Sequence, residues 1–142
     1  MRYCANLTIS LLITLLLSSC SQHPTASLYQ QLGGENGIAA ITDGLLREIA
    51  QDKRIVHHFA DTDIARFRTL LAEQLCDISG GPCVYSGGTM QESHTGFNIS
   101  LADYDALVEG LIKVMQQQNI SISAQNQLLA LLAPMYKDIS YR

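Results

Sequence analysis

The sequence lacks the motifs that mark the common catalytic machineries. Its 142 residues contain no glycine loop ending in Lys-Ser or Lys-Thr, no Gly-x-Ser-x-Gly turn and no His-Glu-x-x-His pattern. No segment alternates apolar and polar residues with the period of two that a half-buried strand requires. No internal repeat is present either, so the length indicates one domain. These absences leave ordinary hydrolytic chemistry without an evident site.

Positive charge is also scarce. Nine Lys and Arg residues stand against 13 Asp and Glu residues. Without Arg2, which belongs to the export segment described next, the balance is 8 − 13 = −5. No basic stripe remains, and we therefore expect no nucleic-acid partner.

The first residues have the layout of an export signal. Arg2 precedes an uncharged apolar run of eleven residues, 7–17, and small residues follow it. This run is too short for a membrane-spanning helix, which needs ~20 residues. We therefore exclude residues 1–19 from the folded domain as a signal peptide that is cleaved.

Residues 17–20 read LSSC, which resembles the lipobox of bacterial lipoproteins. The resemblance implies that Cys20 is lipidated and that the protein is anchored in the cell envelope. Ser21 in place of Asp implies the outer membrane, with the domain facing the periplasm. Several acyl chains at ~0.8 kcal/mol per buried CH₂ are enough for stable anchoring. The alternative is an ordinary secretory signal with a coincidental cysteine.

The remaining chain divides into a short linker and one domain. Residues 20–26 comprise the lipidated cysteine and a polar linker, and residues 27–142 form the domain. Cys76 and Cys83 are the cysteines left within that domain. An oxidising compartment permits a disulfide between them, and two reduced cysteines are the equally weighted alternative. With only His94 at hand, the pair does not make a four-ligand zinc site.

Apolar residues recur at three- and four-residue steps in four segments, the spacing of helices with one buried face. The segments are residues 36–50, 63–78, 100–115 and 121–139. The third begins at a Ser100–Asp103 capping box, and Ser121 or Ser123 caps the fourth. Pro134 predicts a kink in the fourth.

Residues 80–99 separate the two helix pairs and have no periodicity. They contain five glycines and one proline. A segment this long without regular structure suggests a functional role. We therefore expect two helical hairpins packed on each other, with this segment between them.

His94 is the histidine of interest in the irregular segment. It is flanked by Met90, Phe97 and Ile99, and a neutral imidazole in an apolar slot is a good iron ligand. From spacing alone, a packing histidine is the favoured interpretation.

Residues 80–87 read GGPCVYSG, and Met90, the sequence HTGFNI at 94–99 and Tyr104 follow. This pattern resembles the group 1 truncated haemoglobins, in which Gly-Gly-Pro, Tyr-x-Gly, Met and the proximal His recur at these intervals. The opening LYQQLGG at residues 28–34 extends the resemblance, which covers the chain from residue 27 to about residue 139.

The resemblance implies an all-helical, two-over-two globin fold that encloses haem b. It implies that His94 is the proximal iron ligand. It also implies contacts with the cofactor from five further residues: Phe59, Phe67, Leu71, Met90 and Tyr104. Without a cofactor, these five side chains would be ordinary core residues.

The distal side departs from the family, many members of which place Tyr and Gln there to bond oxygen. The matching positions here are Leu46 and Leu71, so both donors are missing. A donor to a charged acceptor contributes ~1.5–3 kcal/mol, so its loss would weaken oxygen retention ~10-fold or more. Gln74 is either exposed, which we slightly favour, or reaches the distal space. His57 and His58 are either a solvated pair, which we favour, or supply a distal ligand.

Three functions compete at this point. The leading one is a haem protein that reversibly binds oxygen, nitric oxide or CO in the envelope. The enzymatic alternative is a nitric oxide dioxygenase or a peroxidase-like enzyme, and it needs an electron donor that the sequence does not identify. From another class, the domain is a haem-free helical adaptor at the membrane surface, with side chains filling its core.

Overall fold

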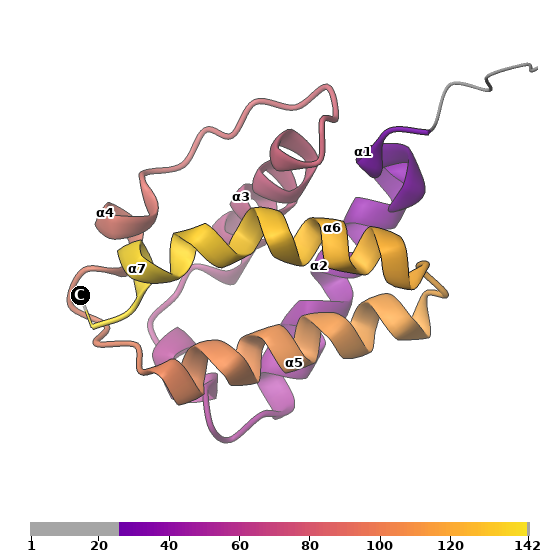
Figure 1. Cartoon of the computed structure of the whole chain (residues 1–142). Coiled ribbons are helices and arrows are strands. Elements are labelled where there is room, and N and C mark those ends of the chain that lie inside the picture. Colours follow the sequence, from indigo (N-terminus) through magenta and orange to yellow (C-terminus); the bar gives the residue numbers. More distant parts are fainter. Residues whose placement is uncertain (1–25, 142) are drawn as a thin grey trace, which may run out of the picture.

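The computed structural model describes residues 26–141 of the chain (Figure 1). The predicted signal peptide, lipobox and Cys20 lie outside these residues. Within them no helix is both long and apolar enough to cross a membrane. They contain no strand, and the only β-type pairing among them is a single bridge between Ile99 and Ser140.

Four long helices form the frame of the domain, and short helical pieces connect them. The long helices are α2 (Gly34–Gln51), α3 (Ile64–Ile78), α5 (Leu101–Gln117) and α6 (Ile122–Leu132). The short pieces are α1 (Leu28–Gln31), η1 (Val56–Phe59), α4 (Met90–His94), η2 (Ala133–Met135) and α7 (Tyr136–Ile139). The four long helices confirm the all-helical prediction.

Side-chain caps explain where the helices begin. Asp63 accepts a hydrogen bond from the Arg66 amide at the start of α3, and the predicted Ser100–Asp103 capping box opens α5. Of the two serines considered for α6, Ser121 is the cap. The expected kink is a break into 3₁₀ geometry at η2, where Pro134 stands at the beginning of the turn.

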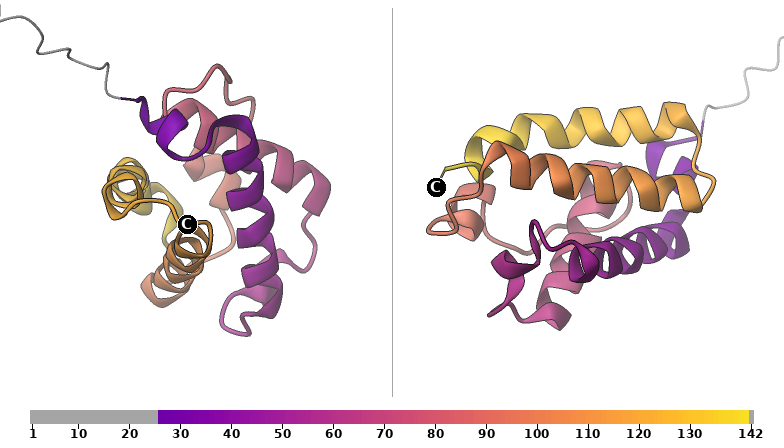
Figure 2. Two further views of the ribbon diagram at one scale, coloured as in Figure 1. Left: turned by 90° about the vertical axis from the view of Figure 1, so that its right-hand side faces the viewer. Right: turned by 90° about the horizontal axis from the view of Figure 1, so that it is seen from below.

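The long helices pack as two pairs. α2 contacts both α3 and α5, while α5 and α6 run side by side (Figures 1 and 2). Gly44 permits the close approach of α2 to α5, because an added Cβ there would lie 2.5 Å from Val114 Cγ1. The result is the two-over-two arrangement that the sequence predicted.

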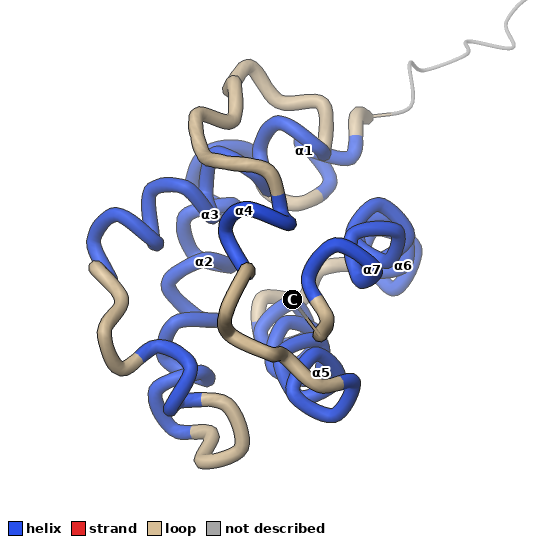
Figure 3. The backbone as a smooth tube through the Cα atoms, turned by 90° about the vertical axis from the view of Figure 1, so that its left-hand side faces the viewer, coloured by secondary structure: helices blue, strands red, loops and turns tan. Residues whose placement is uncertain are grey.

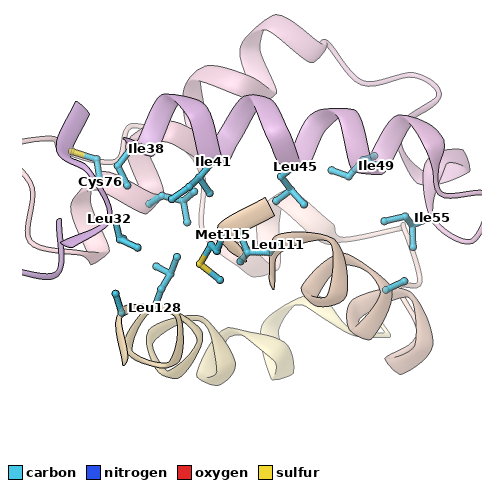
Figure 4. Close-up of a cluster of buried hydrophobic side chains, with 13 residues drawn as sticks. Leu32, Ile38, Ile41, Leu45, Ile49, Ile55, Cys76, Leu111, Met115 and Leu128 are labelled. Carbon is cyan, nitrogen blue, oxygen red and sulfur yellow. The ribbon is translucent and has the colours of Figure 1, made fainter. Parts of the chain in front are cut away.

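A continuous apolar core joins the two pairs. Buried residues of α2 point toward buried residues of α5 and α6 in Figure 4. The largest fully buried apolar side chains are Leu32, Ile41, Leu75, Met115, Leu128 and Val114. Burying a side chain of this size contributes about 1.5–3 kcal/mol, so the core holds the helices that surround the site.

The segment expected to be irregular contains one helix that the sequence analysis missed. α4 covers Met90–His94, and a capping box formed by Thr89 and Glu92 opens it. Five residues are too few to show a periodicity, which is why the pattern did not predict this helix. α4 contacts α7, and the two lie next to each other in Figure 3.

Candidate functional site

A cavity of about 310 Å³ lies between the helix pairs. Its walls come from α2, η1, α3, α4, α5 and the end of α6 with its continuation through η2 and α7, together with residues of the connecting segments. Most of the lining side chains are apolar. The polar ones are His58, Thr62, Gln74, Tyr85, Ser93, His94, Asp103 and Tyr104.

His94 presents one nitrogen that the protein leaves free. Its Nδ1 lies 2.7 Å from the carbonyl oxygen of Met90, one turn earlier on α4. A carbonyl only accepts, so Nδ1 carries the proton and donates it, and Nε2 keeps its lone pair. This hydrogen bond also fixes the orientation of the ring, as is typical of a metal-ligating histidine.

The chain that leads to α4 is tied to α3. Cys76 and Cys83 form a disulfide, which decides between the two states considered from the sequence. Further along, the Ser86 amide and hydroxyl donate to Glu73 Oε2 at 3.0 and 2.7 Å. The bond from the Ser86 hydroxyl is the main reason why the pKa of Glu73 lies below its ordinary value. Residues 80–89 are therefore held against the helix that forms one cavity wall.

Gln74 is part of that wall. It is partly buried, and its Nε2 lies 3.2 Å from the sulfur of Met90 and 3.7 Å from the sulfur of Met135. The favoured interpretation of Gln74 as an exposed helix residue was therefore wrong. The methionine contacts link α3 directly to α4 and η2.

Aromatic residues form two further parts of the lining. Phe59 and Phe67 pack with ring centroids 5.3 Å apart, which connects η1 to α3. Tyr104 meets Tyr136 edge-on at 5.0 Å and donates to the carbonyl of Leu132 at 3.4 Å. Burial raises the pKa of the Tyr104 hydroxyl, which therefore stays protonated at neutral pH. The structure brings all five of the expected cofactor contacts to one cavity.

The chemistry of this lining suits a flat apolar cofactor that brings most of its own metal ligands. Among residues 26–141, no three His, Cys, Asp or Glu side chains cluster to hold a bare metal ion. One imidazole with a free Nε2 can supply a single axial ligand, and apolar and aromatic walls can enclose a macrocycle. The residues therefore fit a haem group.

Comparison with known proteins agrees with this geometry. A family model described as bacterial-like globin matches residues 27–141. The chain belongs to the bacterial-like globin family. Membership implies a haem cofactor and supports haem-based gas binding.

The relatives to which this globin is similar include group 1 truncated hemoglobins. It is 33% identical over 106 residues to the group 1 truncated hemoglobin GlbN of Nostoc commune, covering 75% of this chain and 88% of that protein. It is 27% identical over 113 residues to the group 1 truncated hemoglobin of Tetrahymena pyriformis, covering 80% and 93%. The crystal structure of the Tetrahymena truncated hemoglobin in the Fe(III) form superposes with a TM-score of 0.80 at 26% identity, covering 82% of this chain and 100% of that one.

Of the two leucines expected on the distal side of this globin, only one lines the cavity. Leu71 lines the cavity, as the resemblance implies. Leu46 is partly buried and does not line it, whereas Leu45, one position earlier, does. The expectation for Leu46 is corrected accordingly, because one step along a helix turns a side chain by roughly 100°.

The two adjacent histidines, His57 and His58, have different surroundings. His57 is exposed, and its ring lies against that of His58 with centroids 4.0 Å apart. His58 lines the cavity, beside Asp103 of α5. The solvated-pair interpretation therefore holds for His57 and not for His58. Sequence reasoning noted Asp103 only as a helix cap and missed its place in the cavity wall.

Proposed function

We propose that this globin binds haem b with His94 Nε2 as the proximal iron ligand and uses it to bind a diatomic gas reversibly. The hydrogen bond from His94 Nδ1 to the Met90 carbonyl carries the proposal, because it leaves Nε2 as the ring's only lone-pair donor. The iron would supply the gas-binding chemistry, and the protein would supply the axial ligand and a largely apolar enclosure.

The side chains around the cavity favour weak retention of oxygen. Leu71 lines the cavity at a position where the family resemblance implies a donor, and the Phe59 and Phe67 rings, which pack on each other, line it too. A bound gas that carries partial negative charge gains little from such a wall. Nitric oxide depends less on a donor, so we propose oxygen and nitric oxide as ligands, with oxygen released readily.

We also propose that the globin acts in the cell envelope, anchored through Cys20. The support is the export layout of residues 1–19 and the lipobox-like sequence that ends at Cys20. Growth with a labelled fatty acid should label the native protein and not Cys20→Ser. Equal labelling of both, or of neither, would reject the lipid anchor.

Absorption spectra test haem binding directly. Protein supplied with haem should show a strong band near 400 nm in ferric form and shift on reduction and on addition of CO. His94→Ala should lose the haem or change its axial spectrum. His57→Ala is the matched control, because His57 is exposed and lies outside the cavity lining. A well-folded native protein without haem would instead support the adaptor function.

A further inference from the structure

A carboxylate and a neighbouring imidazole interrupt the apolar lining of the cavity. Asp103 is the only acidic side chain that lines it within the described residues, and no Lys or Arg of those residues lines it. The His58 Nε2 atom lies 3.3 Å from Asp103 Oδ2. The side chains are 11% and 20% exposed, so the pair is largely shielded from water.

Asp103 is held in its charged form. Its Oδ2 accepts hydrogen bonds from the Ser100 hydroxyl at 2.6 Å and from the Ser100 amide at 2.9 Å. These bonds, the hydroxyl first, set the pKa of Asp103 below its ordinary value of 3.8. Its position in the first turn of α5 also favours a negative charge, because the amide groups there point toward it. Asp103 is therefore an anion at neutral pH.

His58 places a polar ring beside this carboxylate but does not form a hydrogen bond with it. The Nε2 atom is buried and makes no well-aligned hydrogen bond. The contact with Asp103 nevertheless joins η1, which carries Phe59, to the start of α5.

A fixed negative charge has a defined effect on a haem in this cavity. Reduction from ferric to ferrous iron removes one positive charge, and an anion stabilises the more positive state. Apolar surroundings screen the interaction less than water does, and local charge and burial are known determinants of haem potentials. We propose that Asp103, positioned by Ser100 and lying beside His58, lowers the reduction potential of the haem and so favours its ferric form. This inference rests on the haem binding proposed above.

Spectroelectrochemical titration of the haem-loaded protein tests it. Asp103→Asn removes the charge and keeps an oxygen able to cap α5, and Asp103→Ser is a second neutral variant. Each should raise the ferrous-to-ferric ratio at a given potential on the order of tenfold, which is about 59 mV for one electron. Asp103→Glu, which keeps the charge, should stay close to the native value.

Asp105→Asn is the matched control. It makes the same change in net charge on the same helix, but Asp105 is exposed and does not line the cavity. Its potential should equal that of the native protein. An unchanged potential in the neutral Asp103 variants, or an equal rise in Asp105→Asn, overturns the proposal. Loss of haem by both neutral variants also overturns it, because the carboxylate would then be needed to maintain the folded structure of the site. Native protein that takes up no haem refutes the proposed function itself.

Discussion

Replacing Leu71 with glutamine should slow the release of oxygen from the haem-loaded globin. Leu71 lines the cavity, and the family resemblance places a glutamine donor at this position in many relatives. A hydrogen bond to a charge-bearing acceptor contributes about 1.5–3 kcal/mol. Since 1.4 kcal/mol corresponds to tenfold, we expect the oxygen dissociation rate to fall by about 10- to 100-fold.

Stopped-flow displacement of oxygen by CO measures this rate, and the same variant should bind nitric oxide almost as the native protein does. Leu131→Gln is the control, because Leu131 is 41% exposed and does not line the cavity. It makes the same chemical change at the surface and should leave the rate unaltered.

Two results would refute the reasoning. Native protein that already releases oxygen as slowly as Leu71→Gln must contain a donor in the cavity, with Gln74 and His58 the residues to examine. An unaltered rate in a correctly folded Leu71→Gln would show that this wall does not face the bound gas.

Three further predictions concern the scaffold of the site. Replacing Cys76 and Cys83 with serine opens an eight-residue ring and should lower the free energy of unfolding by about 2.5 kcal/mol in guanidinium titrations; an unchanged midpoint would contradict this. Gly44→Ala should destabilise the fold by ~1–3 kcal/mol in the same assay, and adding Val114→Ala should relieve the clash, so equal losses in both would argue against it. The folded-state pKa of Glu73 is below 4.5, so its contribution is present above that pH and is lost as the pH falls through the lowered value. Melting temperatures between pH 6 and pH 3 should therefore fall less steeply in Glu73→Gln than in the native protein.

Local sequence signals predicted the four long helices well, because helix periodicity and capping depend only on residues a few positions apart. The Ser100–Asp103 box and the break at Pro134 stand where the pattern indicated. The same signals missed α4, which is shorter than the window in which a period can be recognised. Its Thr89–Glu92 capping box was the one local sign of it.

The candidate site shows a different limit. The family resemblance singled out His94, but only its contact with the Met90 carbonyl shows which ring nitrogen stays free. Gln74 looked like a surface residue because the sequence of its own helix does not show which residues pack against it. The methionine sulfurs it contacts come from α4 and η2, which the chain brings together only on folding.

The sequence by itself determined the helical class and the positions of the long helices, since these follow from residue type and short-range spacing. The family resemblance added His94 as the expected iron ligand. Only the tertiary structure decided that Leu45 and not Leu46 lines the cavity, and that His58 meets Asp103 in its wall. Periodicity says that a helix has a buried face. The angle at which helices cross decides which residue of that face borders a cavity, and this angle depends on the packing of the whole domain.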